Sequence, residues 1–102
     1  MKHSVSHPLS SADAKRAVEA AFGEYSQRFA GFAPQMQWVA PELAQVGFQA
    51  LGRKIVAQVR VLDRALEIDM DVPLLARPFM GRATAAIDRE VARWVGVIKA
   101  QA

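Results

Sequence analysis

The chain has 102 residues, of which 52% are hydrophobic and 23% charged, with a formal net charge of +3. These values predict one folded domain spanning residues 1–102 and argue against disorder and against a separate second domain. The absence of cysteine excludes disulfides, thiolate nucleophiles and zinc sites built on cysteine.

The N-terminal residues predict a short edge strand. Residues 2–6 alternate weakly, and Pro8 ends the pairing because it has no N–H to donate. This segment lacks the apolar run of a secretory signal. No later apolar run approaches the roughly 20 residues that span a membrane. We therefore expect a protein of the cytoplasm without a transmembrane segment.

A helix is predicted next. Ser10 and Ser11 are suited to cap it, and Asp13 in the first turn complements its dipole. Gly31 and Pro34 mark its end. Apolar residues at helical spacing give it one apolar face: Ala14, Val18, Ala21, Phe22, Tyr25 and Phe29.

Strict alternation of apolar and polar residues follows, which is typical of an antiparallel sheet with one solvated face. The predicted strands lie at 36–40, 43–50, 54–62 and 65–72. The turns between them are predicted at Pro41-Glu42, Leu51-Gly52 and Asp63-Arg64. Pro73 ends the last strand.

The turn at 63–64 predicts the register of the strands that flank it. A two-residue turn places Val61 opposite Leu66 on the apolar face and Arg60 opposite Glu67 on the solvated face. A shift of one residue would destroy both matches. This hairpin is therefore the most strongly specified part of the predicted sheet.

The two earlier hairpins differ in how well they fit the same rule. The turn at 51–52 places Phe48 opposite Ile55, which keeps the apolar face continuous. Across the first hairpin the rule puts Gln37 opposite Val46, a mismatch. We therefore expect a β-bulge or a different loop there.

The last predicted element is a long helix. Pro78 suits its first turn, where no N–H is needed, and Gly81 is expected to permit a close approach to the sheet. Apolar residues then recur at helical spacing to about residue 99: Phe79, Ala83, Ile87, Val91, Trp94 and Ile98.

These elements predict an α+β fold: an antiparallel sheet of four to five strands with two helices packed on one face, in the order β-α-β-β-β-β-α. A long helix over a curved sheet can also leave an apolar cavity for a small ligand. Met36 and Trp38 lie in an edge strand that would support a homodimer.

Residues 66–91 contain a strand, then Leu74-Leu75-x-x-Pro78-Phe79-x-Gly81, then a helix with Ile87 and Val91 at a spacing of four. This segment resembles the polyhydroxyalkanoic acid system protein family, also called the granule-region family. The similarity extends in pattern over nearly the whole chain, although Met80 stands where many relatives carry a basic residue. The resemblance implies a setting near polyhydroxyalkanoate synthesis, with the granule or a granule-associated protein as partner. It implies no enzymatic activity and no cofactor.

The junction of the last strand and helix holds the residues predicted to bind a partner. They are Leu74, Leu75, Arg77, Pro78, Phe79, Arg82, Arg89 and Arg93. The leucines and phenylalanine either cap the core or form an exposed apolar patch for a partner or polymer surface.

The arginines of this junction form a stripe, because Arg82, Arg89 and Arg93 are seven and four residues apart. They are either an ordinary solvated helix face or a basic surface for an anionic partner. The stripe lacks the interleaved aromatic residues of a single-strand binder, so nucleic acid is not the expected partner.

Three carboxylates share one face of the strand at 65–72: Glu67, Asp69 and Asp71. Their alternation is explained by a solvated face that Arg60 and Lys54 neutralise from the neighbouring strand. The alternative is a site for acid–base chemistry or a hard cation.

The two histidines do not form a predicted metal site. His3 and His7 would stand roughly 13 Å apart on a strand, too far to share one ion. Both lie in a terminal segment that we expect to fray. No nucleophile motif of the Gly-x-Ser-x-Gly type and no Gly-rich phosphate loop occurs. We therefore expect a non-enzymatic protein without metal or cofactor.

Three functions remain open from the sequence. The first is an accessory protein that binds the polyhydroxyalkanoate granule, or a granule protein, through residues 74–81 and the last helix. The second is a carrier of a small apolar or acyl ligand held between sheet and helices. The third is a nucleic-acid binder that uses the arginine stripe.

Overall fold

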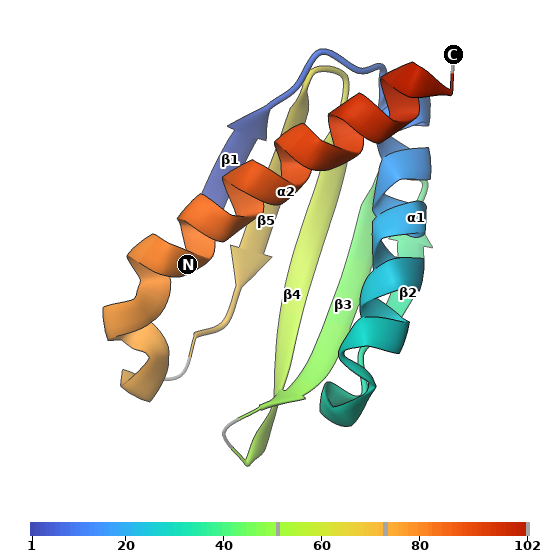
Figure 1. The fold of residues 1–102 in the computed structure, drawn as a ribbon. Helices are drawn as coiled ribbons and strands as arrows, with labels where there is room; N and C mark the ends of the chain where they lie inside the picture. Colours follow the sequence, from blue (N-terminus) through green and yellow to red (C-terminus); the bar gives the residue numbers. More distant parts are fainter. Residues whose placement is uncertain (51, 73, 102) are drawn as a thin grey trace.

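The computed structural model describes residues 1–50, 52–72 and 74–101, without the side chains of 74–76. Its strands are β1 (Lys2–Ser6), β2 (Gln35–Ala40), β3 (Leu43–Ala50), β4 (Arg53–Leu62) and β5 (Ala65–Met70). Its helices are α1 (Ser11–Arg28) and α2 (Met80–Ala100), with short 3-10 helices η1 (Ala30–Phe32) and η2 (Leu74–Phe79). The strands form one antiparallel sheet in the order β1-β5-β4-β3-β2, and both helices lie across the same face of it (Figure 1). The predicted fold class and element order are confirmed.

The β4–β5 hairpin has the register that its turn predicts. Val61 pairs with Leu66, and Arg60 pairs with Glu67 on the opposite face. Arg64 in the turn has a φ of 64°, a left-handed conformation that tight hairpin turns require. Phe48 and Ile55 also pair, as expected for the β3–β4 hairpin.

The β2–β3 hairpin contains the irregularity expected from its mismatch. Gln37 pairs with Gln45 rather than with Val46, and the register shifts between Trp38 and Ala40. The β-bulge absorbs one residue, so Met36 and Val46 pair on the same face of the sheet.

The N-terminal segment is ordered by pairing, so the expectation that it frays is wrong. Every residue of β1 pairs with β5. The N-terminal ammonium of Met1 donates to the Met70 carbonyl at 2.7 Å. Beyond the strand, the His7 N–H donates to the Arg64 carbonyl at 3.1 Å, and the Arg64 N–H donates to the Leu9 carbonyl at 3.0 Å. The free edge of β5 supplies the partners that terminal segments usually lack.

The helix ends show where local signals succeeded and where they failed. The Ser10 hydroxyl accepts from the Asp13 N–H, so the predicted N-cap of α1 is confirmed. Pro78 lies inside η2, and α2 begins only at Met80. Gly81 is exposed, and a side chain there would meet nothing within 4 Å. The expected close approach of Gly81 to the sheet is therefore wrong.

The buried core lies at one end of the molecule. Small alanines of α1 let its N-terminal half pack closely, and the C-terminal part of α2 closes over the same region. The helices diverge toward their other ends (Figure 1). The core consists of Leu9, Ala14, Ala17, Val61, Leu66 and Ile98. Ala44, Ile55 and Ala57 of the sheet are also buried, but the rest of the apolar face between the diverging helices is only partly covered.

Candidate functional site

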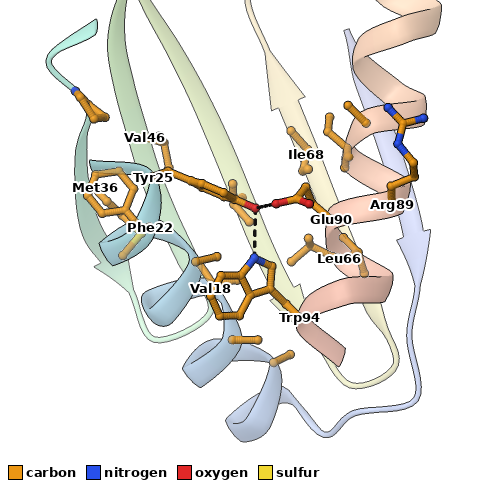
Figure 2. A pocket seen from close by; sticks show the side chains of 18 of the residues that line it. Val18, Phe22, Tyr25, Met36, Val46, Leu66, Ile68, Arg89, Glu90 and Trp94 are labelled. Atoms are coloured by element: carbon orange, nitrogen blue, oxygen red, sulfur yellow. Dashed lines mark hydrogen bonds between the residues drawn. The ribbon is translucent and has the colours of Figure 1, made fainter. Parts of the chain in front are cut away.

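An apolar cavity of about 770 Å³ lies between the sheet and both helices and is partly open to solvent. Figure 2 shows the labelled side chains converging on it from α1, α2 and the strands. Nearly all of its wall is apolar. The main contributors are Val18, Ala21, Phe22, Phe29, Met36, Val46, Phe48, Leu66, Ile68, Ile87, Val91 and Trp94.

The apolar face of α1 explains both the closed and the open end of this cavity. The whole face predicted from the sequence lines it. Near the N-terminus of α1 the face presents Ala14 and Ala17, which are buried in the core. Further along it presents Phe22, Tyr25 and Phe29, which line the cavity. The face therefore changes from small, buried side chains at the core to large side chains along the cavity.

Three polar side chains link the two helices across the cavity. The Tyr25 hydroxyl donates to the Glu90 carboxylate, and the Trp94 Nε1–H donates to the Tyr25 oxygen at 3.0 Å (Figure 2). The Tyr25 and Trp94 rings also meet edge to face, with centroids 6.5 Å apart. Their polar atoms are thus satisfied by one another, as buried polar groups require.

Arg93 extends this network to the surface. It donates to Glu90 at 3.2 Å and to Glu24 of α1, and it lies 4.6 Å from the centre of the Trp94 ring. Hydrogen bonds from Arg93 and then Tyr25 lower the pKa of the Glu90 carboxyl. Burial, followed by the hydrogen bond to Glu90, raises the pKa of Tyr25. Glu90 therefore stays ionised and Tyr25 stays neutral over the physiological range.

His7 lines the end of the cavity next to the core. Only 8% of it is exposed, and its Nδ1 accepts from the Leu9 N–H at 3.1 Å. Its Nε2 is buried without a hydrogen-bond partner in the described structure. His3 instead pairs with Asp88 of α2 at 2.8 Å. The histidines are therefore separate structural contacts, and the burial of His7 was missed because its segment was expected to fray.

Arg77, Pro78 and Phe79 of the predicted strand–helix junction do not line the cavity. The side chains of Leu74 and Leu75 fall outside the described residues. Arg77 and Pro78 are exposed, and Phe79 is 57% exposed. This part of the described surface therefore presents an unburied aromatic ring and a cation.

The predicted arginine stripe is divided among different environments. Arg93 is held by Glu24 and Glu90. Arg89 lies at the rim of the cavity, whereas Arg82 is exposed and does not line it. The three arginines therefore do not present one uniform cationic surface.

Glu67 and Asp69 of β5 and Asp71, which follows the strand, are exposed. Glu67 stands 3.9 Å from Arg60, and Asp71 stands 3.9 Å from Arg53 rather than from Lys54. Among the described residues, no three potential ligands come together in a metal-binding group. The solvated-face interpretation accounts for these carboxylates.

The network of Tyr25, Glu90 and Trp94 was not predicted as a unit. The sequence placed Tyr25 and Trp94 on the apolar faces of their helices. Glu90, however, lies 65 residues from Tyr25, and the direction in which two helices cross is not encoded in either periodicity. The only feature of the local sequence that hints at this network is a glutamate next to the apolar stripe of α2.

Comparison with known proteins assigns the family. Residues 2–94 match the family described as "Putative polyhydroxyalkanoic acid system protein". Comparisons with curated proteins and with solved structures gave no significant match. Among the described residues, no helix is both long and apolar enough to cross a membrane. The chain belongs to the polyhydroxyalkanoic acid system family.

Proposed function

We propose that this polyhydroxyalkanoic acid system protein is a non-enzymatic binding protein that holds an acyl chain between its sheet and helices. The observation that carries the proposal is the apolar cavity of about 770 Å³. This volume lies within the roughly 300–1,000 Å³ typical of ligand sites. The family description supplies the chemical class, because hydroxyalkanoic acids and their oligomers carry alkyl groups.

The composition of the cavity wall supports an acyl chain over a polar ligand. Burial of apolar surface contributes about 25 cal/mol per Å², and an apolar cavity holds water poorly. The polar groups of Tyr25, Glu90 and Trp94 already satisfy one another. An alkyl chain therefore gains contact with the wall without breaking a hydrogen bond.

Cavity-filling variants test this function. The neutral dye Nile red should bind the wild-type protein with increased fluorescence, and dodecanoate should displace it. Ala21→Phe and Ala86→Phe add rings from opposite helices into the cavity wall. We expect each to weaken dodecanoate binding at least about tenfold, because the added ring occupies the volume the chain needs.

Neighbouring alanines provide matched controls. Ala20 and Ala85 are exposed and lie outside the cavity wall, so Ala20→Phe and Ala85→Phe should retain wild-type affinity. Unfolding curves would verify that all four variants fold. Equal affinity in the cavity and control variants, or no binding by the wild type, would refute the proposal.

Attachment to the granule surface is a second candidate, favoured by the exposure of Phe79. A large exposed apolar side chain next to cations suits adsorption to an apolar surface with anionic groups. Phe79→Ser should then lower retention on purified polyhydroxyalkanoate granules several-fold. Val39→Ser is the control, because Val39 is 50% exposed on β2. Equal retention of both variants and the wild type would exclude attachment through Phe79.

A further inference from the structure

We propose that the ligand is an acyl chain with a free carboxylate, which Arg28 and Arg89 hold at the mouth of the cavity while the alkyl tail points toward the core. This inference rests on the proposed acyl-binding function and adds the head group and the direction of entry. It is argued from the positions and partners of the two arginines.

Arg28 belongs to the cavity-facing side of α1. It follows Ala21 by seven residues, which places it on the same face two turns later, and it lines the cavity. Its side chain is 63% exposed, and its nearest ion-pair partner, Glu24, is 4.0 Å away. Its guanidinium also lies 5.4 Å from the centre of the Phe29 ring. Arg28 is thus a cation at the wide, open end of an apolar wall.

The second cation of the proposed site, Arg89, comes from α2. It lines the cavity, and among the described residues it forms no ion pair and no side-chain hydrogen bond. Figure 2 shows Arg89 on α2, with its guanidinium turned away from the network of Tyr25, Glu90 and Trp94. All five donors of this guanidinium are therefore available to an incoming acceptor.

The charges around the mouth leave an excess of positive charge. Glu24 and Glu90 are both bound by Arg93, and Glu90 also accepts from Tyr25. Arg28 lies 4.0 Å from Glu24 and also within electrostatic reach of Glu90, so Arg28, Arg89 and Arg93 exceed these two carboxylates by one positive charge. A carboxylate on the ligand matches a guanidinium in charge and in its two-oxygen geometry.

The opposite end of the cavity suits the tail. There the wall merges with the buried core at Leu9, Ala14 and Leu66, and the polar group is one unpartnered ring nitrogen of His7. A carboxylate at that end would exchange its hydration for a single imidazole nitrogen, whereas two guanidinium groups line the cavity elsewhere, so its burial there is more costly. The ligand therefore enters tail first.

Competition between two probes of equal chain length tests this inference. Dodecanoate and dodecanol are compared for displacement of Nile red at low salt. The wild type should prefer dodecanoate by about fivefold, since an exposed ion pair contributes up to about that much. The preference should shrink in 0.5 M NaCl because salt screens exposed charges. Arg28→Gln/Arg89→Gln should reduce it to within about twofold, with dodecanol affinity unchanged.

The control removes the same charge elsewhere. Arg53 and Arg60 lie on β4 outside the cavity wall, so Arg53→Gln/Arg60→Gln should keep the preference for dodecanoate. If the wild type binds both probes equally, the head-group inference fails while acyl binding stands. If neither probe binds, both proposals fall. A preference that persists in Arg28→Gln/Arg89→Gln would place the head group elsewhere and overturn the inference.

Discussion

Glu90 contributes a carboxylate to the edge of the apolar cavity. Tyr25 and Arg93 donate to its carboxylate, and Arg93 carries the compensating charge. The Glu90 side chain is 38% exposed, so these hydrogen bonds outweigh the cost of its partial burial. The network therefore joins α1 to α2 without filling the space between them. The Glu90 carboxylate is stable at this position because Tyr25 and Arg93 both donate hydrogen bonds to it.

The lowered pKa of Glu90 predicts a pH-dependent contribution to stability. Its ordinary value is 4.5, so below that pH the unfolded chain binds a proton before the folded chain does. The contribution is complete above the ordinary value and is lost as pH falls through the lowered folded value. Glu90→Gln should lower the free energy of unfolding at pH 7 by less than about 1 kcal/mol, because the group is partly exposed.

Urea unfolding of both proteins at several pH values measures this contribution. The difference between wild type and Glu90→Gln should shrink toward zero below about pH 4, under the ordinary carboxyl range. Glu19→Gln is the control, because Glu19 is exposed on α1 and forms no ion pair among the described residues. A difference that stays constant with pH would contradict the role given to Glu90.

At the scale of elements, the sequence predicts the strands better than it predicts the helix packing. The β4–β5 hairpin was predictable in register because two strict alternations and a two-residue turn agree. The β2–β3 bulge was also indicated, since the simple register placed Gln37 against Val46. In both hairpins, side-chain pattern and turn length together restrict the pairing to one solution.

The residue at which α2 begins and the ordering of the N-terminal segment could not be predicted without knowledge of tertiary contacts. Pro78 fits a first helical turn or a 3-10 turn equally well by φ alone, and the structure places it in η2. Burial of His7 depends on the Arg64 carbonyl, which lies in a distant turn. Neither the position of Pro78 in η2 nor the hydrogen bond between His7 and Arg64 can be predicted from the local sequence.

At the scale of the whole molecule, the space between the sheet and the two helices contains the packed core at one end and the cavity at the other. The helices meet at the core end and diverge over the sheet (Figure 1). The sequence predicted that a cavity between the sheet and the helices was possible, but not which end of this space it occupies or how far it extends, because these depend on the crossing of the two helices. Since the core closes one end, a ligand can occupy the other end while the core stays packed.

The location of a bound acyl chain tests the central claim most directly. Protein mixed with uniformly ¹³C-labelled dodecanoate would be examined by NMR for nuclear Overhauser contacts between the alkyl chain and protein side chains. We predict contacts to Phe22, Leu66 and Trp94, which line the cavity. Contacts confined to Phe79, or no contact with any cavity residue at saturating ligand, would contradict the proposed binding site.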